Sequence, residues 1–340
     1  MEKFLIADNL LRDKKLEEAM ELFLQSMEEE PEARPYCYYA LAEIANEANE
    51  PEKAYELYYQ AFGVMPNITS KLFPKEHKSY KYIFEGIRPE KRREDCPLCG
   101  KICSPRWCYC LAEGHGYNYS INPIRIWMYC EPCHHLFARD FPEKIFLNNK
   151  ESRKIEHQRF SLYSDILINI SRYAQGTSFF EIGFGAGEFL LAAREMGYDV
   201  FGIDVIDKHV RQIKELYKLE NNVETADFNE YESAKKYDVI IMGDVLEHVS
   251  DPVKAIEKAE SLLSDDGALW ISTPNFDSAV SVIYGHKEPM RREQYHINYF
   301  SRESLLALLE RFNLVAVEYR ISRSYNGSME VIALKKSRFE

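Results

Sequence analysis

Apolar and polar positions follow two different patterns in the C-terminal half of the chain. From residue 177 onward, short apolar runs alternate with longer stretches in which apolar residues recur at helical spacing. This pattern predicts strands that form a parallel sheet covered by helices. We expect strands at 178–183, 199–204, 222–225, 238–242, 268–272, 314–320 and 329–335. The last two are joined through Asn326-Gly327, a strong hairpin signal, so the last strand should be antiparallel and residues 177–340 should form one doubly wound α/β domain.

The N-terminal part of the chain repeats itself at an interval of 35 residues. The recurring positions hold small residues, an aromatic residue and a proline: Ala19, Phe23, Ser26 and Pro31 return as Ala54, Tyr58, Ala61 and Pro66, with Tyr38, Leu41, Ala42 and Ala45 in the first helix of the second unit. This spacing resembles the tetratricopeptide repeat, whose small residues let paired helices approach. Because two units are fewer than the three or so that usually stand alone, residues 1–67 should lean on a neighbouring unit or a second subunit. They are either a packing surface or a site that binds a peptide or protein.

The composition is that of a soluble globular protein with two or three units. The chain has 340 residues, of which 46% are hydrophobic and 29% are charged. No apolar run approaches the roughly 18 residues that span a bilayer, and the N-terminus lacks the layout of a secretion signal, so we expect a cytoplasmic protein with no membrane partner. The net charge of −12 argues against a nucleic-acid partner.

Two connectors separate the units in this interpretation. Residues 68–107 carry 10 basic and 5 acidic residues, and the part at 68–95 reads as a basic, irregular connector. Residues 141–176 place apolar side chains at helical spacing and should form a helical connector: Ile155, Phe160, Tyr163, Ile166 and Ile170.

Seven of the eight cysteines lie between residues 96 and 133. Two C-x-x-C pairs, Cys96 with Cys99 and Cys130 with Cys133, are separated by 30 residues. Two such knuckles complete a tetrahedral cage of four thiolates, so residues 96–140 are expected to be a small zinc ribbon with a structural Zn²⁺. A second metal on Cys103, Cys108, Cys110 and His115 stays open, as does a ligand role for His134 or His135.

A glycine-rich loop follows the first strand expected in the C-terminal domain. Glu181 is followed by Gly183, Gly185 and Gly187, and a helix should begin at Glu188. Glycines let a ligand approach the backbone at the carboxyl end of a strand. In the dinucleotide fingerprint the third glycine stands one position later, where this chain has Glu188, so the loop favours a ligand other than a dinucleotide.

Acidic residues follow the next strands in order. Asp204 ends the second strand and is placed to accept hydrogen bonds from ribose hydroxyls. Asp227, after the third strand, is placed to accept from an adenine amino group, with Phe228 available to pack on the ring. Asp244 follows the fourth strand.

Together these motifs resemble those of class I S-adenosylmethionine-dependent methyltransferases, over roughly half the chain. The resemblance implies a Rossmann-like seven-stranded methyltransferase domain, preceded by the helical repeat-like region and the zinc ribbon. It also implies S-adenosylmethionine as cofactor, with binding roles for Glu181, Gly183, Gly185, Gly187, Asp204 and Asp227 and a strand-end role for Asp244.

Two histidines are candidates for the base that removes the acceptor's proton, because histidine titrates near neutral pH. His248 follows Glu247 after the fourth strand, and His296 lies in the insertion before the helix that starts near Ser301, where substrate loops emerge. We favour His296, with Tyr295 or Tyr299 as a helper. The four-cysteine unit, this core and the segment from His296 to Ser301 resemble deoxysugar C-methyltransferases, in which the histidine and tyrosine serve acid/base chemistry.

The function that these patterns favour is methyl transfer to a small-molecule or glycan acceptor, with the zinc ribbon bracing the acceptor pocket. An alternative is a protein or peptide methyltransferase that recruits its target through residues 1–67. A third is a binding module without activity, which the intact acids at 181, 204 and 227 argue against. The acceptor atom, whether carbon, oxygen or nitrogen, is left open.

Overall fold

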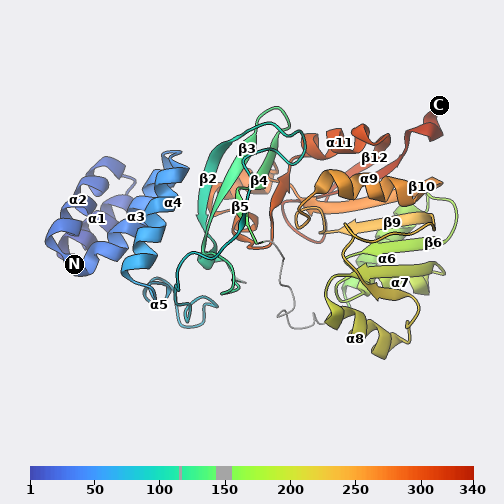
Figure 1. Cartoon of the computed structure of the whole chain (residues 1–340), viewed down its shortest axis with the longest axis horizontal. Coiled ribbons are helices and arrows are strands. Elements are labelled where there is room, and N and C mark those ends of the chain that lie inside the picture. Colours follow the sequence, from blue (N-terminus) through green and yellow to red (C-terminus); the bar gives the residue numbers. More distant parts are fainter. Residues whose placement is uncertain (115–116, 143–154) are drawn as a thin grey trace.

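The computed structural model of the chain describes residues 1–114, 117–142 and 155–340. The chain is elongated, with N-terminal helices at one end, a small sheet in the middle and a larger sheet at the other end (Figure 1). None of the helices in these ranges combines the length and the apolar character that a membrane span needs. His115 lies outside the described residues, so its proposed part in a second metal site has no structural counterpart here.

Four helices form two hairpins at the N-terminus: α1 (Glu2–Arg12), α2 (Leu16–Glu29), α3 (Arg34–Glu47) and α4 (Pro51–Val64). The repeating small and aromatic positions lie inside, where Ala19, Phe23 and Tyr58 are at most 1% exposed. The second hairpin packs on the small sheet: the Asn46 side chain accepts a hydrogen bond from the amide of Cys108 at 2.9 Å. The second hairpin therefore shares a core with the neighbouring unit, whereas the first hairpin packs in a separate cluster with the start of α3.

The segment between the helices and the small sheet is irregular. It contains only the four-residue helix α5 (Thr69–Leu72) and the short strand β1 (Lys91–Arg92), which pairs with β5 (Asp140–Phe141). Tyr82 is only 3% exposed and packs edge-on against Phe62 of α4 and against Tyr117. Part of the expected connector is thus packed rather than solvated.

The small sheet has four antiparallel strands in the order β11-β4-β3-β2. Three are consecutive: β2 (Ser104–Cys110), β3 (Ile124–Cys130) and β4 (His135–Ala138). The fourth, β11 (Asn298–Phe300), comes from the C-terminal domain and pairs with β4. The sequence pattern predicts only an insertion before the helix near Ser301, and this prediction is corrected: the insertion contains a strand that joins the cysteine-rich unit to the C-terminal domain.

The large sheet contains all seven expected strands: β6 (Ser178–Ile182), β7 (Asp199–Asp204), β8 (Val223–Thr225), β9 (Tyr237–Gly243), β10 (Leu263–Pro274), β12 (Leu314–Ile321) and β13 (Ser328–Lys335). Their order is β12-β13-β10-β9-β6-β7-β8. The five strands from β8 to β10 are parallel, and β13 is antiparallel to both of its neighbours, as the hairpin signal predicted. This is a Rossmann-like α/β fold with a mixed sheet.

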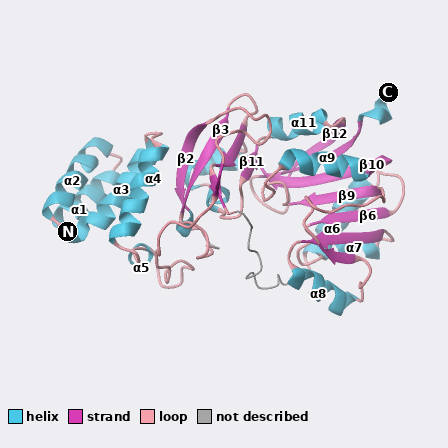
Figure 2. Cartoon of the chain, in the orientation of Figure 1, coloured by secondary structure: helices cyan, strands magenta, loops and turns pink. Residues whose placement is uncertain are grey.

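Helices cover both faces of this sheet: α6 (Arg159–Ile170), α7 (Glu188–Glu195) and α8 (Asp207–Tyr217) on one, α9 (Pro252–Leu262) and α11 (Arg302–Arg311) on the other (Figure 2). Successive side chains of a strand point to opposite faces. Phe179 accordingly packs with residues of α6 and α7, whereas Phe180 packs with residues of α9 and α11. The remaining short helix, α10 (Ala279–Tyr284), lies in the insertion before β11.

Candidate cofactor and acceptor site

The glycine-rich loop connects β6 to α7 with three glycines in the left-handed region. Gly183, Gly185 and Gly187 have φ of 72°, 57° and 83°. A Cβ on Gly187 would lie 2.4 Å from Cδ1 of Ile213, so this position has no room for a side chain. A Cβ on Gly185 would meet nothing within 4 Å, which leaves the backbone open to a ligand at the carboxyl end of the sheet.

Asp204 holds this loop against β7. Its Oδ2 accepts a hydrogen bond from the amide of Gly185 at 2.8 Å, and its Oδ1 accepts from the amide of Ile206 at 2.7 Å. Oδ2 also lies 3.4 Å from Nδ1 of the buried His209, and a carboxylate oxygen has about two lone-pair sites, so Oδ1 is the oxygen that can accept a further hydrogen bond. The Asp204 carboxylate can therefore serve the loop and a ribose hydroxyl at the same time.

Glu181 is a buried acid beside the loop. Burial, with the negative charges of Glu188 and Asp204, raises the pKa of the Glu181 carboxyl well above its usual value. Its Oε2 atom has no hydrogen-bond partner among the residues that the structure describes. A buried acceptor without a partner is costly, so a donating or cationic ligand group is the complement that this position fits.

Asp227 and Phe228 follow β8. Asp227 is exposed and accepts a hydrogen bond from the amide of Asn229 at 2.9 Å. Phe228 is only 4% exposed: it packs against Phe180 in the core, and the ammonium of Lys258 lies 5.8 Å from its ring centroid. The side chain of Phe228 is therefore enclosed by the core, whereas the sequence predicts that it packs on an adenine ring.

The turn after β9 lies beside the glycine loop. A Cβ on Gly183 would be 3.0 Å from Cγ2 of Val245. Asp244, with φ of 53°, accepts a hydrogen bond from the Ser272 hydroxyl at 3.1 Å. Glu247 is 1% exposed, and burial with the charge of Asp244 raises the pKa of its carboxyl well above the usual value. The turn that carries Glu247 and His248 thus adjoins the glycine loop.

The structure brings the two candidate histidines together. His248 and His296 have ring centroids 4.9 Å apart, and one side-chain ligand atom each of Glu247, His248 and His296 lie within 4.8 Å of one another. From the sequence, the two histidines are alternative candidates for the base, and Glu247 is only the neighbour of His248. They form one cluster, with His296 6% exposed.

The tyrosines beside His296 are buried. Tyr295 is 2% exposed, its hydroxyl accepts a hydrogen bond from the Asn118 side chain at 2.9 Å, and burial raises its pKa. Tyr299, in β11, is fully buried beside Trp127, and burial raises its pKa well above the usual value. Of the two expected helpers, Tyr295 adjoins the cluster directly, because its carbonyl bonds Nδ1 of His248 at 3.0 Å.

Arginines from the small sheet hold the His296 loop. Arg125 in β3 is 1% exposed and donates to the carbonyls of Gln294 and His296, both at 2.8 Å, and of Glu293 at 3.3 Å. Arg93 donates to the carbonyl of Ile297 at 2.9 Å. Neither arginine was predicted from the sequence. An arginine inside an apolar strand pattern is the signal that could have found Arg125, because a buried charge requires partners.

The four cysteines of the two knuckles converge. One sulfur each from Cys96, Cys99, Cys130 and Cys133 lie within 4.8 Å of one another, and those of Cys99 and Cys130 are 3.7 Å apart. A tetrahedral site with Zn–S bonds of about 2.3 Å has sulfurs about 3.8 Å apart, so these residues could hold zinc. In the described part of the chain, Cys103, Cys108 and Cys110 form no such group, and the last two are buried under α4.

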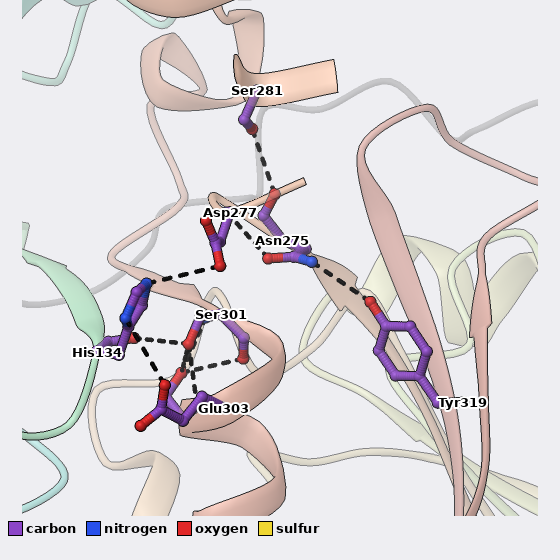
Figure 3. A network of polar contacts seen from close by, with 8 residues as sticks. His134, Asn275, Asp277, Ser281, Ser301, Glu303 and Tyr319 are labelled. Carbon is purple, nitrogen blue, oxygen red and sulfur yellow. Dashed lines mark hydrogen bonds and ion pairs between the residues drawn. The ribbon is translucent and has the colours of Figure 1, made fainter. Parts of the chain in front are cut away.

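The second knuckle docks on the C-terminal domain (Figure 3). The carbonyl of His134 accepts a hydrogen bond from the Ser301 hydroxyl at 2.8 Å, at the start of α11. The imidazole stacks on Phe276, with its nitrogens 3.7 Å from Asp277 and 3.8 Å from Glu303. His135 is fully buried against Phe300, which lowers its pKa to about 3. Both histidines thus pack between the two sheets.

The glycine loop and the acidic residues that follow the strands lie at the carboxyl end of a Rossmann-like sheet, and comparison with known proteins narrows the class of protein. Residues 155–319 match the family described as a methyltransferase domain. A ubiquinone biosynthesis O-methyltransferase of Bordetella avium is 30% identical over 152 residues, which cover 40% of this chain and 61% of that protein. Another, of Nitrosomonas europaea, is 26% identical over 225 residues, which cover 63% of this chain and 91% of that protein.

Several relatives of the same name are matched over a smaller part of their length, with 45% to 46% covered in those of Haemophilus ducreyi and Leptothrix cholodnii. Among solved structures, the magnesium protoporphyrin IX methyltransferase of Synechocystis PCC 6803 aligns with a TM-score of 0.43 at 16% identity, over 54% of this chain and 90% of that one. The family match over residues 155–319 and the order of the motifs show that this part of the chain is a class I S-adenosylmethionine-dependent methyltransferase domain.

Proposed function

We propose that the protein transfers a methyl group from S-adenosylmethionine to a small-molecule or glycan acceptor, and that His296 assists the loss of the acceptor's proton. The observation that supports this proposal is the close approach of Val245, in the turn after β9, to Gly183 of the glycine loop, because the same turn carries His248, whose ring centroid lies 4.9 Å from that of His296. The relatives named as O-methyltransferases of ubiquinone biosynthesis support a small acceptor with a hydroxyl group.

The cofactor supplies an activated methyl group on a sulfonium, and the residues of the chain align it with the acceptor. In this proposal the open backbone at Gly185 admits the cofactor, Asp204 accepts from its ribose, and the exposed Asp227 accepts from its adenine. The Oε2 atom of Glu181 receives a donor group. Gly183, Gly187 and Asp244 shape the two turns that enclose it.

Calorimetry with S-adenosylmethionine tests the cofactor assignment. Asp204→Ala removes both the loop contact and the ribose acceptor, so the affinity should fall at least 10-fold. Asp207→Ala is the matched control, because Asp207 lies three residues on, in α8, and contacts Thr225 and Arg211 at the surface. Wild-type affinity in the Asp204 variant would contradict the assignment.

Transfer of a radiolabelled methyl group to simple phenols, catechols and sugar nucleotides tests the role of His296. We expect His296→Ala to abolish transfer while the affinity for S-adenosylmethionine stays within twofold of wild type. His134→Ala should keep its activity, because this imidazole is 32% exposed and contacts Phe276 and Asp277 rather than His248 or His296. An active His296 variant would end this part of the proposal.

We further propose that the cysteine cluster binds a structural Zn²⁺ that braces the small sheet. A zinc site with four thiolate ligands has no open position for a substrate, so the ion takes no part in methyl transfer. About one equivalent of zinc should accompany the purified protein and be lost from Cys96→Ser. Cys37→Ser is the control, because Cys37 is buried in α3, among the N-terminal helices. Metal-free wild-type protein would refute the site.

A second candidate function, in which the N-terminal helices recruit a protein target, is favoured by an apolar surface on α2. Met20 and Leu24 lie one turn apart and are 38% and 52% exposed. Replacing both with glutamate should leave the fold intact because neither side chain lies in the core. Loss of transfer to a protein target, with transfer to small acceptors retained, would support this candidate. Equal transfer to a protein target would exclude it.

A further inference from the structure

The second helical hairpin and the His296 loop meet at one side chain, that of Glu113. Glu113 ends the short 3₁₀ helix η2 (Leu111–Glu113), which follows β2. Oε1 of its carboxylate accepts a hydrogen bond from the hydroxyl of Tyr39 in α3 at 2.5 Å. Oε2 accepts a hydrogen bond from Nε of Arg292 at 2.7 Å. A single carboxylate therefore joins a helix near the N-terminus to a loop near the C-terminus.

Arg292 lies where the His296 loop begins. It ends the 3₁₀ helix η5 (Pro289–Arg292), four residues before His296. The two backbones are also close here, because a Cβ on Gly114 would lie 2.8 Å from the carbonyl oxygen of Arg292. The guanidinium lies 5.0 Å from the ring centroid of Tyr109 in β2. The position of Arg292 thus sets the start of the segment that carries His296.

The loop depends on side-chain contacts because it is irregular between η5 and β11. The buried arginine of β3 described above holds its carbonyls, and Asn118 donates a hydrogen bond to the hydroxyl of Tyr295 at 2.9 Å. These contacts come from the small sheet and fix the middle of the loop. The pair of Glu113 and Arg292 fixes its start, and of these contacts it is the one that reaches the helices.

The hydroxyl of Tyr39 holds the Glu113 carboxylate in place. The Glu113 side chain is 22% exposed, so without a second partner it would exchange among rotamers in contact with water. The Tyr39 ring is itself fixed, because it packs edge-on against that of Tyr58 at 5.1 Å. The Arg292 side chain is 14% exposed, and the negative charges of Glu113 and Glu43 both act on it. Charged partners that are fixed and largely enclosed interact more strongly than a mobile surface pair.

We propose that Tyr39, Glu113 and Arg292 are positioning residues for methyl transfer, and that the second helical hairpin contributes to the site by holding the His296 loop through the Glu113 carboxylate. The inference rests on the function proposed above. The three residues act through the loop and leave the contact with the acceptor to His296. The helices thereby have a role in the transfer itself, separate from any recruitment of a target.

Hydrogen–deuterium exchange of the full chain measures how firmly the loop is held. The amides of residues 296–298 donate hydrogen bonds to backbone carbonyls, so they exchange when the loop opens locally. We expect Tyr39→Phe and Glu113→Gln to speed this exchange about 5-fold, because a hydrogen bond of the network is lost or weakened. Arg292→Lys keeps the charge opposite Glu113 and should stay closer to wild type.

Methyl transfer to the same phenols, catechols and sugar nucleotides measures the consequence. In Tyr39→Phe and Glu113→Gln the transfer rate should fall about 5-fold, because the loop is in place for less of the time. The affinity for S-adenosylmethionine should stay within about twofold of wild type, because the cofactor residues lie on other strands.

Two control variants separate positioning of the loop from general docking of the helices. Glu52→Gln removes a different ion pair between the second hairpin and the small sheet, in which Oε2 of Glu52 lies 2.9 Å from Arg139. Tyr36→Phe removes a hydroxyl from α3, where the ring packs on Phe4 of α1. Both variants should exchange and transfer as wild type does.

Wild-type exchange in both Tyr39→Phe and Glu113→Gln overturns the inference, and so does exchange that is equally fast in Glu52→Gln. Faster exchange with unchanged transfer overturns the role in catalysis. If Glu113→Gln does not fold, Tyr39→Phe decides, because it keeps the packed ring. Wild-type protein that binds no S-adenosylmethionine overturns the proposed function instead, and the exchange measurement still decides whether the helices hold the loop.

Discussion

Replacing Arg125 with methionine should disable the acceptor side of the site while leaving the cofactor side intact. The guanidinium of Arg125 is buried in the small sheet. It donates hydrogen bonds to three backbone carbonyls of the His296 loop, those of Glu293, Gln294 and His296. Methionine has a similar volume and keeps the packing beside Trp127. The substitution therefore removes the hydrogen bonds and the charge, and little else.

The expected magnitude follows from the geometry of these contacts. A hydrogen bond from a charged donor contributes about 1.5–3 kcal/mol, and two of the three bonds have the short distance of 2.8 Å. The third, at 3.3 Å, is weaker. Burial of methionine offsets part of the loss, so the free energy of unfolding should fall by about 3–5 kcal/mol.

Urea denaturation and calorimetry measure the two halves of this prediction. The affinity for S-adenosylmethionine should stay within twofold of wild type, whereas methyl transfer should fall at least 10-fold because the His296 loop loses its anchor. Arg125→Lys, which keeps the charge but not the forked donor, should be intermediate in both. A methionine variant with wild-type stability and wild-type transfer would refute the reasoning that this arginine positions the loop.

The remaining predictions concern the loop and the buried acids. Gly187→Ala should reduce the free energy of unfolding by about 1–3 kcal/mol in urea denaturation, because it adds strain at positive φ to a clash with Ile213; Gly185→Ala, with open space around it, should cost only about 1 kcal/mol. Burial and the charge of Glu113 raise the pKa of Glu43, which accepts a hydrogen bond from Tyr58, to about 8. Since its usual pKa is 4.5, the folded state holds a proton that the unfolded state releases, and the thermal midpoint should fall between pH 5 and pH 8. Glu43→Gln should flatten this dependence, and an unchanged slope would contradict it.

The large sheet could be predicted from the sequence because its information is local. Each strand is a short apolar run, and neighbouring residues such as Phe179 and Phe180 point to opposite faces of the sheet. The start of β10 was predicted at 268 and lies at Leu263, because the register of β10 against β9 shifts between residues 263 and 268. A backbone irregularity of this kind leaves no mark in a hydrophobic pattern.

The acceptor side could be predicted only in part, because its information is not local. His248 and His296 were each recognisable by residue type and by position after a strand, but nothing in the sequence says that their rings meet. Glu247 becomes a member of the cluster only through burial. The three residues of β11 are too few to form a periodic pattern, and their partner strand precedes them by some 160 positions. Such long-range pairing is decided by the folded topology.

Because β11 pairs with β4 across two units, the chain can be divided into two fragments that depend on each other for one strand pair. A fragment that starts at residue 177 would keep only the single bridge of β11 to Asn275 and would lose its pairing with β4, and one that ends at residue 142 would present β4 as an open edge. Each fragment should aggregate when it is produced alone, and it should bind the other fragment when both are present. Produced together, the two should reassemble by restoring one strand pair, and their reassociation would report directly on whether the acceptor loop is in place. Methyl transfer could then be switched on by mixing two inactive polypeptides.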